Sequence, residues 1–442
     1  MDLLRSAYTS DDEPETLPGT KPVSKPDHLA IFPPSKRPKP NYPYPPLNNP
    51  HHGYWSHSPS VLRPQAPIVG RYVSKREQAL SASVSQVPVL NPDPNRDAPL
   101  SSSPGSIRDS DLPHSISSLL RHQGRGYKQR SQVPERLSIE LHYHTKAVNA
   151  LNWSPSRAHL LASAGMDGSV CIWNVWSRDQ KLARAYRFHS AAVKDVKFSQ
   201  QGLFLLSCGY DNSSRLVDIE KGLETQIFKE DQAVGVTKFH PDNSNIFLSG
   251  GSKGRIKLWD IRTGKVVHEY ARGLGSILDI EFMVNGKQFI SSSDVSGSNI
   301  SENSIIVWDI ARQVPLSNQV YVEAYTCPCI KHHPLDPTFV AQSNGNYIAI
   351  FSSIPPFKLD KYKRYESHGV SGFPIKCNFS LDGEKLVSGS SDGCIYFYDY
   401  KSSELIRKIK AYEQACIDVA FHPVIPNVLA ACSWSGHVSI LE

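Results

Sequence analysis

The sequence predicts an all-β fold in which seven copies of one unit close into a ring. Each copy holds three short β-prone runs separated by turn residues. The third runs end near residues 174, 218, 260, 309, 352, 399 and 442, so the copies follow one another at 42 to 49 residues. A period of about 40–45 residues with four strands per copy is typical of a β-propeller, in which each copy supplies one blade.

The first copy shows the unit most completely. It starts at His144, and its β-prone runs cover residues 148–153, 160–164 and 170–173. The dipeptides Ser154-Pro155 and Asp167-Gly168 separate these runs, and both are turn formers. Each copy should therefore supply the strands a, b, c and d of one blade, with strand a innermost.

The last blade needs an outer strand from elsewhere in the chain. Its third run, residues 438–441, stands at the end of the sequence. Residues 137–141, ahead of the first copy, alternate apolar and polar side chains as a half-buried strand does. We expect this strand to pair with the last blade and close the ring, because closure removes exposed strand edges. The propeller should then cover residues 136–442.

Residues 1–135 form a region of different composition. Of the 33 prolines in the chain, 22 precede residue 136, and apolar periodicity is absent there. Such a segment buries too little apolar surface to offset its ordering entropy. The sequence therefore predicts a disordered, Pro-rich and basic N-terminal tail.

Two basic clusters in this tail are candidate functional segments. Lys36, Arg37 and Lys39 form a short cluster of the kind found in nuclear-import signals. Tyr72, Lys75 and Arg76 lie in an isolated β-prone stretch that could fold on contact with a partner. The alternative for both clusters is a solvated linker that carries charge by chance.

The repeats resemble those of the WD-repeat β-propeller family over about residues 140–442. Within that family the finer likeness is to factor 17-like proteins of pre-mRNA processing. It rests on four segments, which are His144-Thr-Lys-Ala-Val148, Trp259-Asp-Ile-Arg262, Phe357-Lys-Leu-Asp-Lys361 with His368-Gly-Val370, and Cys416-Ile-Asp-Val-Ala-Phe-His-Pro423. The resemblance implies a role in the spliceosome around the second catalytic step, and therefore a nuclear location.

The family resemblance also implies a buried hydrogen-bond network within the blades. In blade 1 the aspartate should accept from the histidine, the histidine should reach the serine, and the serine should bond the tryptophan, because buried polar atoms need such partners. These network residues are His144, Ser163, Asp167 and Trp173 in blade 1, His189, Ser207 and Asp211 in blade 2, and His368, Ser388 and Asp392 in blade 6. Blade 3 keeps Trp259 but has Lys253 at the aspartate position, and blades 5 and 7 lack both the Asp and the Trp.

The recurring His, Ser and Asp residues do not predict catalysis, because the trio repeats in three blades and should be buried in each. The Gly-x-Ser-x-Gly matches around Ser252 and Ser391 fall on predicted b–c hairpins, whereas a nucleophile elbow needs a strand followed by a helix. Cys327, Cys329 and the neighbouring His332 and His333 alternate along one strand, which scatters them as metal ligands. We expect no catalytic site, no metal and no cofactor.

Composition and charge restrict the function further. The net charge of +6 is spread thinly over the chain, so composition alone does not indicate a nucleic-acid binder. No run is long and apolar enough for a signal peptide or a membrane span. The eight cysteines all lie at or beyond Cys171 without a Cys-x-x-Cys pair, and they are most simply buried thiols.

Two functions fit these observations. The first is a non-enzymatic scaffold that binds proteins of the spliceosome, as a monomer within a larger complex and with only indirect RNA contact. The stretch 356–365 interleaves cations with aromatics and could contact single-stranded RNA, but an outer strand guarded by charges is the favoured interpretation. The alternative function is a substrate receptor of a cullin-type ubiquitin ligase, which would dock through the Trp259-Asp260-Ile261-Arg262 box with Arg262 as the partner-binding residue.

Overall fold

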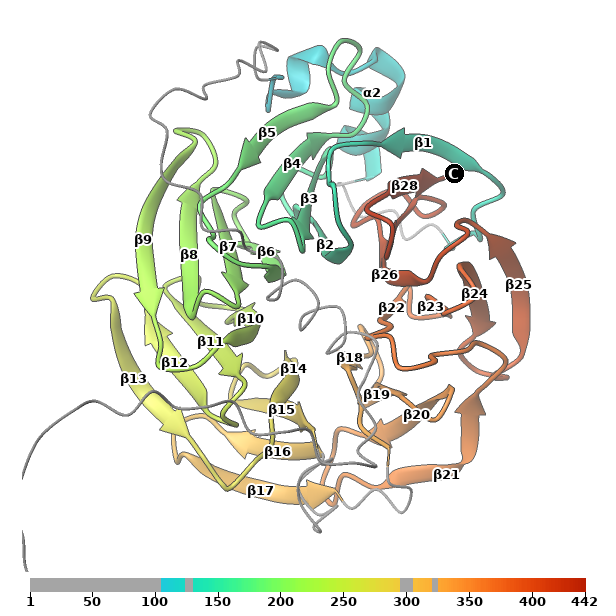
Figure 1. The fold of residues 1–442 in the computed structure, drawn as a ribbon. Helices are drawn as coiled ribbons and strands as arrows, with labels where there is room; N and C mark the ends of the chain where they lie inside the picture. The colour runs from blue at the N-terminus through green and yellow to red at the C-terminus, as the bar shows by residue number, and fades with distance from the viewer. Residues whose placement is uncertain (1–104, 124–129, 295–304, 320–324) are drawn as a thin grey trace, which may run out of the picture. The chain divides into compact units, whose positions relative to one another are not determined.

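The computed structural model describes residues 105–123, 130–294, 305–319 and 325–442, and it is a seven-bladed β-propeller (Figure 1). Seven antiparallel four-stranded sheets stand around one axis, each with its strands in a, b, c, d order from the inside. The predicted fold class is therefore confirmed.

The first three blades follow one another directly along the chain. Blade 1 holds β2 (Val148–Trp153), β3 (Leu160–Gly165), β4 (Val170–Asn174) and β5 (Leu182–Tyr186). Blade 2 holds β6 (Val193–Phe198), β7 (Phe204–Gly209), β8 (Ser213–Asp218) and β9 (Leu223–Lys229). Blade 3 holds β10 (Val234–Phe239), β11 (Ile246–Gly251), β12 (Ile256–Asp260) and β13 (Lys265–Tyr270).

The remaining blades complete the ring. Blade 4 holds β14 (Ile277–Phe282), β15 (Gln288–Ser293), β16 (Ile305–Asp309) and β17 (Val314–Gln319). Blade 5 holds β18 (Cys329–His332), β19 (Thr338–Ser343), β20 (Tyr347–Ser352) and β21 (Leu359–Tyr365). Blade 6 holds β22 (Cys377–Phe379), β23 (Lys385–Ser388), β24 (Cys394–Asp399) and β25 (Leu405–Lys410), and blade 7 holds β26 (Cys416–Phe421), β27 (Leu429–Ser433) and β28 (Val438–Leu441).

Blade 7 takes its outer strand from β1 (Leu137–Leu141), as the sequence predicted. β1 runs antiparallel to β28, with Glu140 opposite Ser439 and Leu141 opposite Val438. The backbones of Arg136 and Glu442 extend the pairing by hydrogen bonds in both directions, each of 3.0 Å. The ring is thus closed by strands from the two ends of the propeller sequence.

The hydrophobic core lies between neighbouring blades. Inner strands such as β3 are buried along their whole length because both faces of their sheet are covered, whereas the outer strand β9 is mostly exposed. At the seam of blades 2 and 3, the rings of Phe228 and Phe247 meet edge to face with centroids 4.9 Å apart. All eight cysteines are buried free thiols, which confirms the prediction from their sequence positions.

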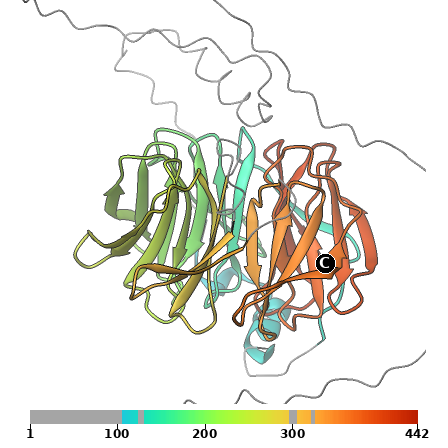
Figure 2. The ribbon, with the colours of Figure 1, turned by 90° about the horizontal axis from the view of Figure 1, so that it is seen from below.

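Part of the predicted tail packs on the propeller instead of remaining a tail without structure. Residues 105–123 include the short 3-10 helix η1 (Asp109–Asp111) and the helix α2 (His114–Gln123), which lies on one side of the ring (Figure 2). Leu112 is buried in the same core cluster as Trp173 and Trp176 of blade 1, and Ile116 and Leu120 of α2 pack against that cluster.

A second part of the predicted tail, residues 130–136, contacts blades 6 and 7. Ser131 donates its backbone N–H to Asp382 at 2.6 Å and its hydroxyl to the Pro426 carbonyl at 3.1 Å, and Val133 packs on the core of these blades. We call residues 105–123 and 130–136 together the clasp. The clasp lies ahead of the predicted boundary at residue 135, and its apolar residues find partners on blades that local sequence does not show.

Candidate functional site

The four predicted network residues of blade 1 form one continuous chain of hydrogen bonds. Trp173 donates its indole N–H to the Ser163 hydroxyl at 2.9 Å, and Ser163 Oγ lies 2.8 Å from His144 Nε2. His144 Nδ1 lies 3.2 Å from the Asp167 carboxylate. Burial would raise the pKa of Asp167, but the hydrogen bonds from His144 and Ser169 hold it well below its usual range. The arrangement joins the d–a loop to strands b and c and leaves none of the trio free for catalysis.

Blade 2 repeats the two histidine contacts and lacks the tryptophan. His189 lies 3.0 Å from Asp211 and 2.8 Å from the Ser207 hydroxyl, while Val217 takes the tryptophan position. Arg215 on β8 approaches Asp211 at 3.3 Å and Glu224 on β9 at 2.7 Å. These ion pairs attach the network of blade 2 to its outer strand.

Blade 6 departs from the expected pattern, because Asp392 does not contact His368. Gln342 from β19 of blade 5 lies between the network residues, 2.6 Å from His368 Nε2 and within reach of the Ser388 hydroxyl at 3.1 Å. The Tyr398 hydroxyl lies 2.9 Å from the other ring nitrogen of His368. Tyrosine at the tryptophan position reaches past the serine to the histidine, so no place remains there for the aspartate.

Asp392 faces the outer strand of blade 6 instead. Its carboxylate accepts a hydrogen bond from the Tyr396 hydroxyl at 2.9 Å and forms an ion pair with Lys408 on β25 at 2.9 Å. Burial, with only a weaker opposing effect from Asp392, lowers the pKa of His368 to about 4. His368 is therefore neutral near pH 7.

Blade 3 contains an inverted network that sequence reasoning missed. Glu230 occupies the histidine position, four residues before Val234, and accepts a hydrogen bond of 2.6 Å from the Ser249 hydroxyl. Trp259 donates to the same hydroxyl at 3.0 Å. The cation stands on strand c, where Lys257 lies 3.5 Å from Glu230. The sequence signal was present, since Glu230 precedes Val234 at the spacing by which His144 precedes Val148.

A second set of polar residues joins the innermost strands of neighbouring blades. The third residue of β6, β14 and β26 is an aspartate whose carboxylate accepts a backbone N–H from the next blade. The bonds are Asp195 to Thr237 at 3.3 Å, Asp279 to Ile330 at 2.7 Å and Asp418 to Leu151 at 2.9 Å. Innermost strands have an unpaired edge, and these aspartates satisfy part of it.

The remaining seams are joined in related ways. Asn152 and Asn378 accept the backbone N–H groups of Phe198 and Phe421, at 2.8 and 3.5 Å. Lys238 of blade 3 pairs with Glu281 of blade 4 at 2.7 Å. At the seam of blades 5 and 6, the Cys329 thiol lies 3.7 Å from the Cys377 carbonyl oxygen. The sequence carried a signal here too, because aspartate recurs at the third position of strand a in three copies.

The Trp259–Arg262 box is only partly accessible. Trp259 is 5% exposed, and the Arg262 guanidinium holds the neighbouring Asp260 through contacts of 2.8 and 3.2 Å. Arg262 itself remains 68% exposed at the c–d turn of blade 3. The structure thus assigns Arg262 a local contact.

Most of the stretch 356–365 lies in the outer strand β21 (Leu359–Tyr365) of blade 5, the interpretation that the sequence favoured. Lys363 lies over the Tyr400 ring at 4.3 Å, and Arg364 lies over the Tyr347 ring at 4.6 Å. Two of its cations are therefore engaged within the blade.

The predicted tail sites, Lys36, Arg37 and Lys39 together with Tyr72, Lys75 and Arg76, lie outside the residues that the structure describes.

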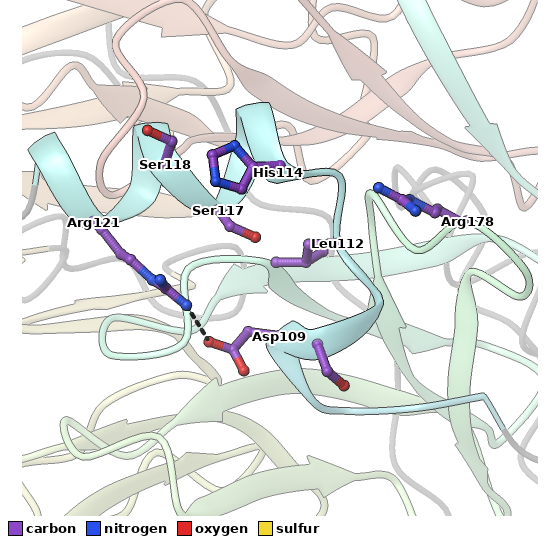
Figure 3. A pocket seen from close by; sticks show the side chains of 8 residues that line it. Asp109, Leu112, His114, Ser117, Ser118, Arg121 and Arg178 are labelled. Atoms are coloured by element: carbon purple, nitrogen blue, oxygen red, sulfur yellow. Dashed lines mark ion pairs between the residues drawn. The ribbon is translucent and has the colours of Figure 1, made fainter.

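A pocket of about 480 Å³ lies between the clasp and blade 1 (Figure 3). Arg121 and Arg178 stand on opposite sides of it, and Arg121 lies 3.8 Å from Asp109 in an exposed ion pair. The other lining residues are Ser110, Leu112, His114, Ser117 and Ser118. The pocket is a product of the clasp, since all lining residues except Arg178 come from it.

Within the described ranges, no three His, Cys, Asp or Glu residues are grouped so that they could hold a metal ion. His332 and His333, which the sequence analysis considered as ligands, instead contact carbonyl oxygens, those of His333 and Gly383, at 2.6 and 2.9 Å. The part of the chain that the structure describes also holds no helix long and apolar enough to cross a membrane.

Four stretches of the chain match the sequence model of the WD domain, G-beta repeat. They are residues 135–174, 180–218, 224–260 and 360–399. The chain belongs to the WD-repeat β-propeller family. Each of these four repeats begins on an outer strand d and continues into strands a, b and c of the next blade. Because of this offset, the first repeat begins with β1, which is the outer strand of blade 7 and closes the ring.

The likeness to individual relatives covers more of the chain than the four matched stretches do. WD repeat-containing protein 25 of Mus musculus is 39% identical over 316 residues, which cover 71% of this chain and 58% of the relative. Pre-mRNA-processing factor 17 of Mus musculus is 31% identical over 345 residues, 74% of this chain and 58% of the relative. The factor 17 of Saccharomyces cerevisiae is 27% identical over 342 residues, 73% of each protein. The chain therefore spans 58% of the length of the two mouse relatives.

Proposed function

We propose that this WD-repeat propeller is a non-enzymatic scaffold that binds proteins of the pre-mRNA processing machinery in the nucleus. The observation that carries the proposal is the similarity to proteins named Pre-mRNA-processing factor 17, which extends over 74% of this chain in the mouse relative and 73% in the yeast relative. The similarity covers more of the chain than the four family matches do.

The geometry of the blades supports a scaffold. In blades 1 and 2 the His, Ser and Asp residues that resemble a hydrolase triad are bonded to one another, with His144 and His189 each held between a carboxylate and a serine. Ser252 and Ser391 lie in turns between adjacent strands, where no nucleophile elbow forms. A rigid ring with seven sets of loops offers many contact surfaces, and loops positioned by a scaffold are where binding is usual.

The tail contributes to the proposal as a separate part. Tyr72, Lys75 and Arg76 would dock on a partner, and Lys36, Arg37 and Lys39 would direct nuclear import. A basic arm adds association rate and salt sensitivity, while the ring supplies specificity. Replacing the import cluster by alanine should reduce nuclear accumulation of a fluorescent fusion, whereas Lys21→Ala and Lys25→Ala together serve as the matched control.

The proposal is tested by assembling splicing complexes on a tagged pre-mRNA in nuclear extract. An epitope-tagged full chain should be recovered with the pre-mRNA only when ATP is supplied. A matched RNA without splice sites should recover much less. Equal recovery on both RNAs would show non-specific RNA binding and would contradict the proposed role.

A further inference from the structure

Polar side chains recur at one position of the innermost strands around the propeller axis. β2, β6, β10, β14, β18, β22 and β26 are the innermost strands (Figure 1). Their penultimate residues are, in blade order, Asn152, Lys197, Lys238, Glu281, Lys331, Asn378 and Ala420. Lys376 lies two residues before Asn378 and therefore on the same side of the strand. Five of the seven penultimate residues are hydrogen-bond donors, and Lys376 adds a sixth.

The acidic groups near the axis are bonded to the backbone of the innermost strands. Asp195, Asp279 and Asp418 each bond a backbone N–H of the next blade, so their carboxylates lie close to the strands. Asp279 and Asp418 also accept a neighbouring backbone N–H with the other oxygen, at 2.9 and 2.8 Å. The protein backbone consequently uses part of the acceptor capacity of these carboxylates.

The lysine side chains have more unused hydrogen-bonding capacity than the acidic side chains. Glu281 is shared, with Lys238 at 2.7 Å and Lys331 at 3.7 Å. Lys376 approaches Asp418 at 3.4 Å, and Lys197 pairs with Asp195 at 2.5 Å. An ammonium group has three N–H donors, and one contact at 3.4 or 3.7 Å uses few of them.

The lysines also remain in contact with solvent. The side chains of Lys197, Lys238, Lys331 and Lys376 are 16, 24, 23 and 20% exposed. The lysine side chain is longer than that of aspartate. The four ammonium groups and the shared Glu281 therefore form an inner layer around the axis, and the three aspartates form an outer layer. The eight groups sum to no net charge, but an anion near the axis meets the inner layer first.

The four lysines influence one another across the ring. Burial is the main cause that lowers the pKa of the Lys197 ammonium, and Asp195 opposes it. Three other ammonium groups lower that pKa further, namely those of Lys376, Lys331 and Lys238. They come from blades 6, 5 and 3, so cations from both sides of the axis face the same space. On Lys331 and Lys376 burial is outweighed by neighbouring carboxylates, among them Asp279 and Asp418, which raise the pKa of both ammonium groups and keep them charged.

We propose that the propeller axis is a binding site for a phosphate group, held mainly by Lys331 and Lys376 with Asn152 and Asn378 as neutral donors. Asn152 and Asn378 use their side-chain oxygens on backbone N–H groups, which leaves their amide N–H groups for a ligand. The phosphate can belong to a free ion or to a phosphorylated side chain. Both present the same tetrahedral set of acceptors, which suits several converging donors.

The site is tested with the full chain and inorganic pyrophosphate as the probe, measured by calorimetry at low salt. The double variant Lys331→Gln, Lys376→Gln should bind pyrophosphate about tenfold more weakly for each lysine replaced. Lys229→Gln and Lys265→Gln on outer strands should bind as the wild type does. No binding up to about 10 mM pyrophosphate, or equal binding by the double variant, would overturn the site.

A second measurement needs no variant and remains informative if the double variant does not fold. Reductive methylation of the wild-type chain should be slowed by pyrophosphate at Lys331 and Lys376, but not at Lys265. Unchanged labelling of all three lysines would contradict the site. A short phosphoserine peptide, used as a second probe, distinguishes the sources. Protection by the peptide as well indicates a partner's phosphate, and protection by pyrophosphate alone indicates a free ion.

Discussion

Glu230 and Ser249 are joined by a hydrogen bond of 2.6 Å at the place where blade 1 joins His144 to Ser163. In each blade this serine, Ser163 or Ser249, also accepts the tryptophan N–H. The network is therefore defined by its serine and tryptophan, and the third member can be a histidine or a carboxylate. When that member is a carboxylate, a lysine on strand c balances its charge.

The first prediction concerns this inverted network. Glu230 has a fully buried side chain, and Lys257 is 10% exposed. Glu230→Ala should destabilise the chain by about 1–3 kcal/mol, because it leaves the buried Ser249 hydroxyl without its acceptor, while Lys257 keeps its contact with Asp231 at 3.1 Å. Lys253→Ala removes only an exposed pair with Asp231 and should cost below about 1 kcal/mol. Equilibrium denaturation of both variants checks the difference, and equal effects would argue against a structural role for Glu230.

The second prediction compares the aspartates of blades 1 and 6. Asp167 holds the buried His144, so Asp167→Ala should cost about 1–3 kcal/mol. Asp392 is 41% exposed and pairs with the half-exposed Lys408, so Asp392→Ala should cost less than about 1 kcal/mol. Trp173→Ala should cost about 3–5 kcal/mol, as large aromatic truncations in cores do. A greater loss from Asp392→Ala than from Asp167→Ala would contradict this assignment.

The third prediction concerns the clasp. Removing residues 1–104 should leave the melting temperature of the chain nearly unchanged. Leu112→Ala should destabilise it by about 2 kcal/mol, because Leu112 is buried against blade 1. Leu119, on the following helix α2, is 42% exposed, so Leu119→Ala serves as the control with an effect within about 0.5 kcal/mol. Equal melting of the two variants would mean that the clasp does not hold blade 1.

The fourth prediction is a loss of stability between pH 7 and pH 5. Burial lowers the pKa of His368 to about 4 and that of His422 to about 3, whereas a histidine in the unfolded chain titrates near about 6.5. Below about pH 6.5 the unfolded state binds more protons than the folded state, so the free energy of unfolding falls as the pH falls. The lowered pKa of Asp167 has the same sign, but it acts only below about pH 4.

The measurement is the free energy of unfolding of the wild type and of His368→Gln at pH 7, 6 and 5. The variant should lose less stability than the wild type over this range. His114, which is exposed on α2, provides the control, and His114→Gln should follow the wild type. A wild-type stability that is constant from pH 7 to pH 5 would contradict the burial of neutral histidines.

The fold was predictable because the repeat pattern is local. Each strand of the first copy is announced by its own apolar run and turn residues, and the closing strand 137–141 by its alternation. The blade 1 contacts follow from a matched set of four residue types. The blade 6 contacts could not be predicted in the same way, because Gln342 belongs to another blade and reaches His368 only through the packing of the ring.

Two other features could not be predicted from the sequence, for similar reasons. The clasp is rich in polar residues, and three of its apolar anchors, Leu112, Ile116 and Leu120, are stabilising only where they pack against the core cluster that contains Trp173 of blade 1. The ring of charges at the axis is spread over residues 195–418, so no window of the sequence contains it. Only the recurrence of aspartate at one position of strand a pointed to it.

The most direct test of the proposed function is affinity capture of the tagged full chain from nuclear extract at low and moderate salt, read by mass spectrometry and by hybridisation to small nuclear RNAs. The wild type should enrich spliceosomal proteins together with those RNAs. The variant Tyr72→Ala, Lys75→Ala, Arg76→Ala should recover less of them and melt unchanged. Recovery of a cullin and its adaptor without spliceosomal components, or no enrichment of spliceosomal proteins over an unrelated WD-repeat propeller, would contradict the account.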